Sequence, residues 1–230
     1  SMRSAQDGSS TEFRITADTT ANVGHWSNYP ITVARRLAGN FPFPLKGAKV
    51  AFASDLPIAA GMSSSSALVV GMMQILSAIN QLDQSQPYRA NIQSIEDLAS
   101  YLGCVEKGQT FRALAGTEGV GTFGGSEDQV AILCSQPGTV NQYSFVPVQY
   151  QGSIQSPEGY RFAVAGSGVM ARKTGDARDR YNRLSLSTRA ILRRWNEATD
   201  RNDPHLAGAV ASMPDAANRL RHLLRTGRCG

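Results

Sequence analysis

The apolar positions along the chain predict several helices. Apolar residues recur at helical spacing from Trp26 to Ala38, with Pro30 in the first turn, where proline is tolerated. The segment Ala67–Ile79 is apolar on nearly every side, so we expect a buried central helix there. A capping-box pattern at residues 94–97 predicts the start of another helix. From about Asp179 the chain becomes polar and helical in pattern.

Short strand-like segments are interspersed with these helices, and together they predict an α+β fold. We expect a mixed sheet with the central and capped helices packed on it over residues 12–150. The start of a smaller α/β domain is expected over residues 151–230. Residues 1–11 are polar and are expected to be a tag and a disordered lead-in. The predicted strands are Lys49–Ser54, Gln142–Gln149, Arg161–Ala165 and, more weakly, Glu12–Ala17.

The stretch Pro57–Ala67, which contains four successive serines, joins an apolar strand to the central helix. Small residues let the backbone approach an anion, and the first N–H groups of a helix face it. The stretch lacks the Gly-Lys-Ser/Thr sequence of a P-loop. A serine-rich N-cap on a core helix is the alternative interpretation, but the pattern exceeds what a cap requires. The pattern therefore favours phosphate binding.

Composition and charge narrow the class of protein. The chain has 230 residues, 41% of them hydrophobic, and no apolar run approaches the roughly 20 residues that span a bilayer. Its net charge is +5, but the late arginines are interleaved with helix formers and no aromatic stacking platform accompanies them, so we expect a solvated helix face and no nucleic-acid partner. Cys104, Cys134 and Cys229 are widely spaced, which favours a reducing cytoplasm over disulfides or a zinc site.

Two carboxylates are candidates for chemistry. Asp128 follows a pair of glycines and precedes an apolar segment, where it could take a proton from a substrate hydroxyl; an aspartate in a turn is the alternative. Glu106 follows the capped helix and would act as a cation ligand only if the fold brings it to the serines. The serine run has no Gly-x-Ser-x-Gly elbow, which argues against a hydrolase.

Read together and in order, these blocks resemble the GHMP kinases, and the galactokinase branch most of all. Pro57–Ala67 is similar to the second signature of the superfamily, Pro-x-x-x-Gly-Leu-Ser-Ser-Ser-Ala. Trp26–Tyr29 matches the galactokinase Trp-x-x-Tyr, and Gly125–Gln129 matches its Gly-x-Met-Asp-Gln. Ser167–Val169 and Tyr181-Asn182 match its Ser-x-Val and Tyr-Asn block. The similarity covers roughly residues 12–195 at the level of motifs.

The resemblance implies transfer of a phosphoryl group from ATP to a sugar hydroxyl, with Mg²⁺. Residues 12–150 would then be the ATP-binding domain. Asp128 would be the base or would orient the attacking hydroxyl, Gly125 would offer its backbone to the sugar, and Tyr181 would pack against the sugar. Ser65 and Glu106 would ligate Mg²⁺. The residues that would hold the phosphates are Pro57, Ala60, Gly61, Met62, Ser63, Ser64, Ser65 and Ser66.

The chain departs from the galactokinase pattern in several places. Met62, Ser66 and Glu127 replace a leucine, an alanine and a methionine of the family motifs. The first family block has no counterpart before Trp26, and the third glycine-rich motif is absent. We therefore expect weak or absent kinase activity from these 230 residues alone, and an open sheet edge that favours a homodimer or poor solubility. Two alternatives remain: another GHMP enzyme that acts on a uronic acid, arabinose, heptose or amino sugar, and a non-catalytic relative that binds a sugar, a nucleotide or a protein.

Overall fold

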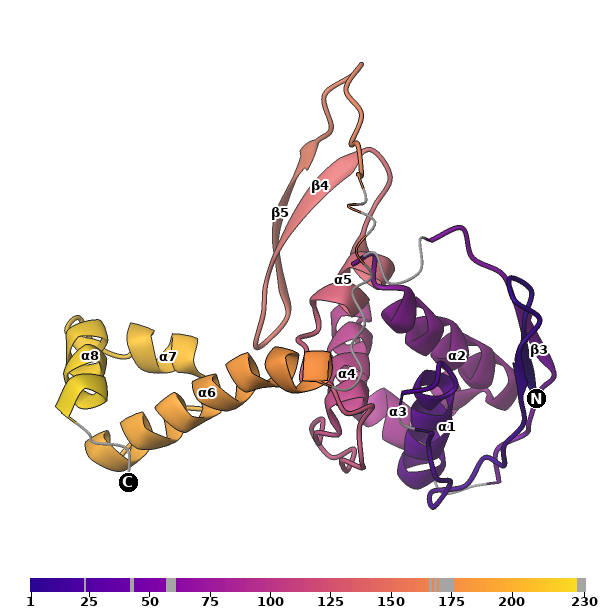
Figure 1. Cartoon of the computed structure of the whole chain (residues 1–230), viewed down its shortest axis with the longest axis horizontal. Helices are drawn as coiled ribbons and strands as arrows, with labels where there is room; N and C mark the ends of the chain where they lie inside the picture. The colour runs from indigo at the N-terminus through magenta and orange to yellow at the C-terminus, as the bar shows by residue number, and fades with distance from the viewer. Residues whose placement is uncertain are drawn as a thin grey trace. The chain divides into compact units, whose positions relative to one another are not determined.

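The chain divides into two units. The computed structural model describes residues 1–22, 24–41, 44–56, 61–165, 167, 169 and 176–226. Contacts between Cα atoms separate Ser1–Gly175 from Asp176–Gly230. The first unit runs past the expected boundary after residue 150, and the strand that begins at Gln149 pairs with the strand before it within this unit (Figure 1).

The three-stranded sheet of the first unit is mixed, as predicted. β1 (Met2–Ser4) lies between β2 (Ser10–Thr11), to which it is antiparallel, and β3 (Val50–Phe52), to which it is parallel. These strands correct the expectation that residues 1–11 are disordered. The Met2 side chain is buried in the core, and the backbone of its strand pairs with β3, which lies far along the chain.

The helices of the first unit include those that the apolar spacing predicted. α1 (Asn28–Asn40), α2 (Ser64–Asn80) and α4 (Ile95–Lys107) confirm the three expected there. The short elements η1 (Leu82–Gln84) and α3 (Gln86–Asn91) connect α2 to α4. α5 (Glu127–Cys134) follows a glycine-rich segment, residues 116–125. No helix in the described part of the chain is long and apolar enough to cross a membrane.

The core of the first unit lies where α1, α2 and α4 pack together. Each of these helices contributes apolar side chains that are almost completely inaccessible to solvent. Burial of such side chains supplies most of the free energy that holds helices together. The residues at the centre are Val33, Leu37, Val69, Met73, Leu76, Leu102 and Val105.

A β-hairpin follows α5 and corrects one strand prediction. β4 (Thr139–Ser144) and β5 (Gln149–Gln155) pair in antiparallel orientation. The strand predicted at 142–149 is therefore the end of β4, a turn and the first residue of β5. No strand forms within the described residues 12–17 or 161–165, where two others were predicted.

The second unit is helical throughout its described part, where the start of an α/β domain was expected. It consists of α6 (Asp176–Thr199), α7 (Leu206–Ala211) and α8 (Ala216–Thr226). Their apolar faces meet around Trp195, which is fully buried and packs with Ala209 and Leu220.

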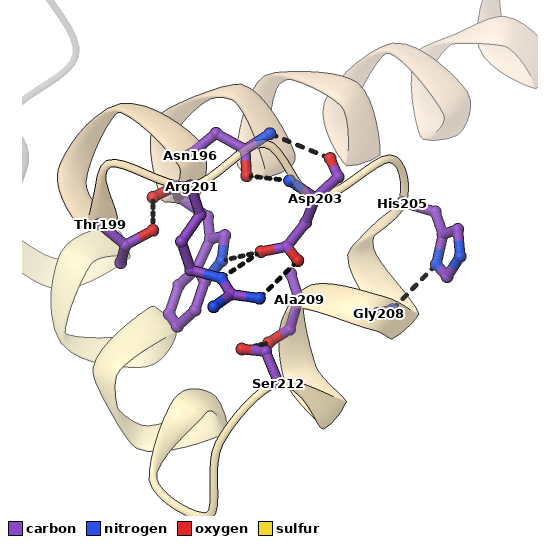
Figure 2. A network of polar contacts seen from close by, with 9 residues as sticks. Asn196, Thr199, Arg201, Asp203, His205, Gly208, Ala209 and Ser212 are labelled. Carbon is purple, nitrogen blue, oxygen red and sulfur yellow. Dashed lines mark hydrogen bonds and ion pairs between the residues drawn. The ribbon is translucent and has the colours of Figure 1, made fainter.

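A network of hydrogen bonds joins the end of α6 to the loop that precedes α7 (Figure 2). Asp203 accepts hydrogen bonds from Trp195 Nε1 at 2.9 Å and from Arg201 Nε at 2.7 Å. Asn196 bonds to the backbone N–H and C=O of Asp203, each at 3.0 Å. The hydrogen bonds from Arg201 and Trp195 lower the pKa of the Asp203 carboxyl from 3.8 to about 2.

Candidate active site

The N-terminus of α2 is where the sequence predicts an anion site. Ser63 is the N-cap residue and has a left-handed backbone, with φ 53°, which is uncommon for a residue other than glycine. Its side chain accepts no capping hydrogen bond from the first turn. Gly61 and Met62, just before it, are exposed. The first N–H groups of this 17-residue helix are therefore not capped by the N-cap side chain, and the positive end of its dipole lies there.

Ser66, in the first turn of α2, lies between two carboxylates. Its Oγ is 3.2 Å from Glu106 Oε2 on α4 and 3.3 Å from Asp128 Oδ2 on α5. A hydroxyl has only one proton to donate, and hydroxyl–oxygen hydrogen bonds are usually about 2.7–2.8 Å long. One serine therefore cannot fully satisfy both carboxylates. The structure brings together three residues that the sequence singled out separately.

Close packing of α4 on the turn before α5 brings the two carboxylates together. A Cβ added at Gly103 would lie 2.8 Å from Ser126 Cβ and 3.1 Å from Ser126 Cα, so only glycine allows this approach. Glu106 lies three residues after Gly103, and therefore on the same face of α4. Ser126 is the N-cap residue of α5, and Asp128 follows in its first turn.

The glycine-rich segment, residues 116–125, packs against the C-terminal end of α4. Val120 N–H donates to the carbonyl of Glu106 at 2.9 Å, and a Cβ at Gly119 would lie only 2.3 Å from that same oxygen. From α1, Asn28 Nδ2 donates to the Val120 carbonyl at 2.9 Å, and Arg35 donates to the Glu118 carbonyl. The backbone of the segment is therefore held by the end of α4 on one side and by side chains of α1 on the other.

Two further residues complete the surroundings of the site. Gln129, which is fully buried, donates a hydrogen bond from Nε2 to Glu106 Oε2, and its own Oε1 has no partner among the described residues. Tyr29 is the other: burial, and then the charge of Glu106, raises the pKa of its hydroxyl, and the nearby Ser65 side chain lowers it. Both residues belong to motifs quoted above, but the sequence assigned neither of them a role.

The other predicted site residues lie in different places. Gly125 is exposed, immediately before the N-cap of α5. Tyr181 is 40% exposed on α6, in the second unit, so its role beside a sugar stays a prediction. Pro57 and Ala60 lie outside the described residues. The serine whose hydroxyl contacts the two carboxylates is Ser66, next to the predicted Mg²⁺ ligand Ser65.

The donor atoms at this point fit Mg²⁺. A serine hydroxyl and two carboxylates are hard oxygen ligands, which Mg²⁺ prefers. The described residues contain no group of three or more His, Cys, Asp or Glu side chains that could hold a metal by themselves. Proteins usually bind Mg²⁺ through one or two carboxylates together with substrate phosphates and water.

Comparison with known proteins identifies the domain that holds this site. No curated protein matches the chain. Residues 28–136 match the family model described as GHMP kinases N terminal domain, and this range includes Ser66, Glu106 and Asp128. Residues 28–136 are therefore identified as a GHMP kinase N-terminal domain.

Proposed function

We propose that this domain binds Mg-ATP at the N-terminus of α2 and takes part in phosphoryl transfer to a sugar hydroxyl, as in a galactokinase-like enzyme. The match to the N-terminal domain of a kinase superfamily supports the general activity. The observation that carries the proposal is the meeting of Ser66, Glu106 and Asp128 at the first turn of α2. An anion site and a pair of oxygen-rich side chains are then adjacent, as transfer of a phosphoryl group requires.

In this proposal, separate groups of residues bind the phosphates and Mg²⁺. Backbone N–H groups and hydroxyls of Ser63, Ser64 and Ser65 would hold the phosphates. Glu106 and a serine hydroxyl, either Ser65 as predicted or Ser66 as the contacts favour, would hold Mg²⁺. When bound, Mg²⁺ neutralises charge on the phosphate oxygens.

Asp128 supplies the proton acceptor in this proposal. The acceptor hydroxyl gives its proton to the Asp128 carboxylate while its oxygen forms a bond to the γ-phosphorus, and the bond from that phosphorus to the bridging oxygen breaks to release ADP. Most of the rate enhancement would come from positioning and charge neutralisation. The sugar acceptor rests on the galactokinase-like blocks, in which Gly125 and Tyr181 would contact the sugar. Another small-molecule acceptor and a non-catalytic relative are the alternatives.

Titration calorimetry with a non-hydrolysable ATP analogue and Mg²⁺ tests the nucleotide site. We expect saturable binding by the wild type that is weakened at least tenfold in Ser66→Ala and in Glu106→Gln when Mg²⁺ is present. Ser77→Ala, the same change as Ser66→Ala in the last turn of α2, should bind like the wild type. The acceptor is then tested by measuring ADP formation from ATP in the presence of each of several monosaccharides, including galactose. A folded wild-type chain that binds no nucleotide would refute the proposal.

A further inference from the structure

We propose that Gln129 is a positioning residue that holds the Glu106 carboxylate in the orientation needed to bind Mg²⁺. This inference rests on the proposed function, because it concerns the same cation site. Gln129 has no place in the roles assigned above, although it follows Asp128 directly. Its Nε2 donates to Glu106 Oε2, the same oxygen that accepts from Ser66 Oγ.

Two donors on one oxygen fix the direction in which the carboxylate faces. The terminal torsion of a glutamate is broad, so a carboxylate without fixed partners samples many orientations. Gln129 reaches Glu106 from α5, and Ser66 reaches it from α2. Partners of this kind, which contact a metal ligand and not the metal, strongly affect how well a site binds its cation.

The helix packing described above places Gln129 opposite Glu106. Gly103 and Ser126 form the closest approach between α4 and the start of α5. Glu106 and Gln129 each follow these contact residues by three positions, and residues three apart share a helix face. Successive residues of a helix are rotated by about 100°. Asp128 and Gln129 therefore reach different helices, Asp128 toward Ser66 on α2 and Gln129 toward Glu106 on α4.

Packing alone does not explain a glutamine at this position. The side chain is fully buried, and among the described residues its Oε1 has no hydrogen-bond partner. A buried polar atom without a partner is destabilising, whereas methionine would fill a similar volume without that effect. The hydrogen bond from its amide to Glu106 therefore explains why a glutamine occupies this position.

Binding of Mn²⁺, used as a paramagnetic substitute for Mg²⁺, tests this role in the full chain. Free Mn²⁺ is measured by electron paramagnetic resonance in the presence of a saturating non-hydrolysable ATP analogue. Gln129→Met removes the donor and should weaken Mn²⁺ binding by about 10- to 100-fold. Gln74→Met, the same change on an exposed position of α2, should bind Mn²⁺ like the wild type. Binding of the analogue without metal should not change in either variant.

A double-mutant cycle separates positioning from a general structural effect. In a Glu106→Gln background, Gln129→Met should have little further effect on Mn²⁺ binding, because the group that it positions is gone. If Gln129→Met does not fold, Gln129→Asn, whose amide is one methylene shorter, serves in its place. Mn²⁺ affinity of Gln129→Met within twofold of the wild type would overturn the inference alone, provided that Glu106→Gln still weakens Mn²⁺ binding. No Mn²⁺–nucleotide binding by the folded wild type would overturn both this inference and the proposed function.

Discussion

Gly103 should be the position where an added methyl group most directly disturbs the candidate site. In Gly103→Ala the new Cβ would lie 2.8 Å from Ser126 Cβ and 3.1 Å from Ser126 Cα, whereas carbon atoms normally approach to about 3.5–4.0 Å. Neither atom can be moved by rotating a side chain, since both are fixed by the backbone of residue 126. The start of α5 must therefore shift, and Asp128 with it.

Two opposing terms set the size of the effect. Overpacking of this kind destabilises by about 1–3 kcal/mol. Alanine in place of glycine inside a helix stabilises by about 1 kcal/mol. Gly71 provides a matched control, because it lies inside α2 and a Cβ there would meet nothing within 4 Å. Gly71→Ala should show the gain alone, so the two variants should differ by the overpacking term, about 1–3 kcal/mol.

Urea unfolding measures this difference, with amide hydrogen exchange in α4 to assign the transition to the first unit. We expect Gly71→Ala to raise the unfolding midpoint and Gly103→Ala to leave it unchanged or lower it. Gly103→Ala should also weaken nucleotide binding in the presence of Mg²⁺, because a shift of α5 moves Gln129, which contacts the proposed Mg²⁺ ligand Glu106. Equal stabilisation by the two variants, with unchanged binding, would refute the argument that α4 and the start of α5 approach closely only because residue 103 has no side chain.

Three other substitutions have expected outcomes. Ser94→Ala removes the oxygen that accepts from Asp97 N–H at 3.2 Å and should lower the free energy of unfolding by about 1 kcal/mol in urea, whereas Ser94→Asp should largely preserve it. Tyr101→Phe removes a buried hydroxyl that donates to Asn40 Oδ1 at 2.9 Å, and it should lower the free energy of unfolding by about 1–2 kcal/mol. An unchanged urea midpoint would show that this hydrogen bond contributes nothing to stability. Asp203 has a pKa lowered to about 2 in the folded chain, so its stabilising effect is present above its ordinary value of 3.8 and is lost as the pH falls toward 2. The protection of α6 amides against hydrogen exchange, relative to their intrinsic rate at each pH, should fall over that range in the wild type, and identical profiles for the wild type and Asp203→Asn would contradict this.

Local signals explain which elements could be predicted from the sequence. α1, α2 and α4 follow from apolar spacing and, for α4, from the Ser94 cap, all of which act within a few residues. β1 and β2 were missed because their sequence is polar and their pairing with Val50–Phe52 is distant along the chain. The hairpin turn at 145–148 was missed because strand-like residues continue through it.

The site could be predicted only in part, for a similar reason. The motifs identified Asp128, Glu106 and the serine run, and the structure brings these together. They could not decide which serine reaches the carboxylates, because successive helical residues differ by about 100° in direction and the first residue of α2 was unknown. The structure begins α2 at Ser64, which turns Ser66 toward α4 and α5. Gln129 carried no chemical signal of its own beyond its place in a motif.

The origin of the site in three separate helices has a consequence for how the protein folds. Ser66 is 40 residues from Glu106 and 62 residues from Asp128 along the chain. Each helix can form from local interactions, but the hydroxyl meets the carboxylates only after the helices have docked, and such distant contacts form slowly. A collapsed intermediate with native helix content would therefore still lack the site. During refolding, recovery of nucleotide binding should lag behind recovery of the helical circular dichroism signal.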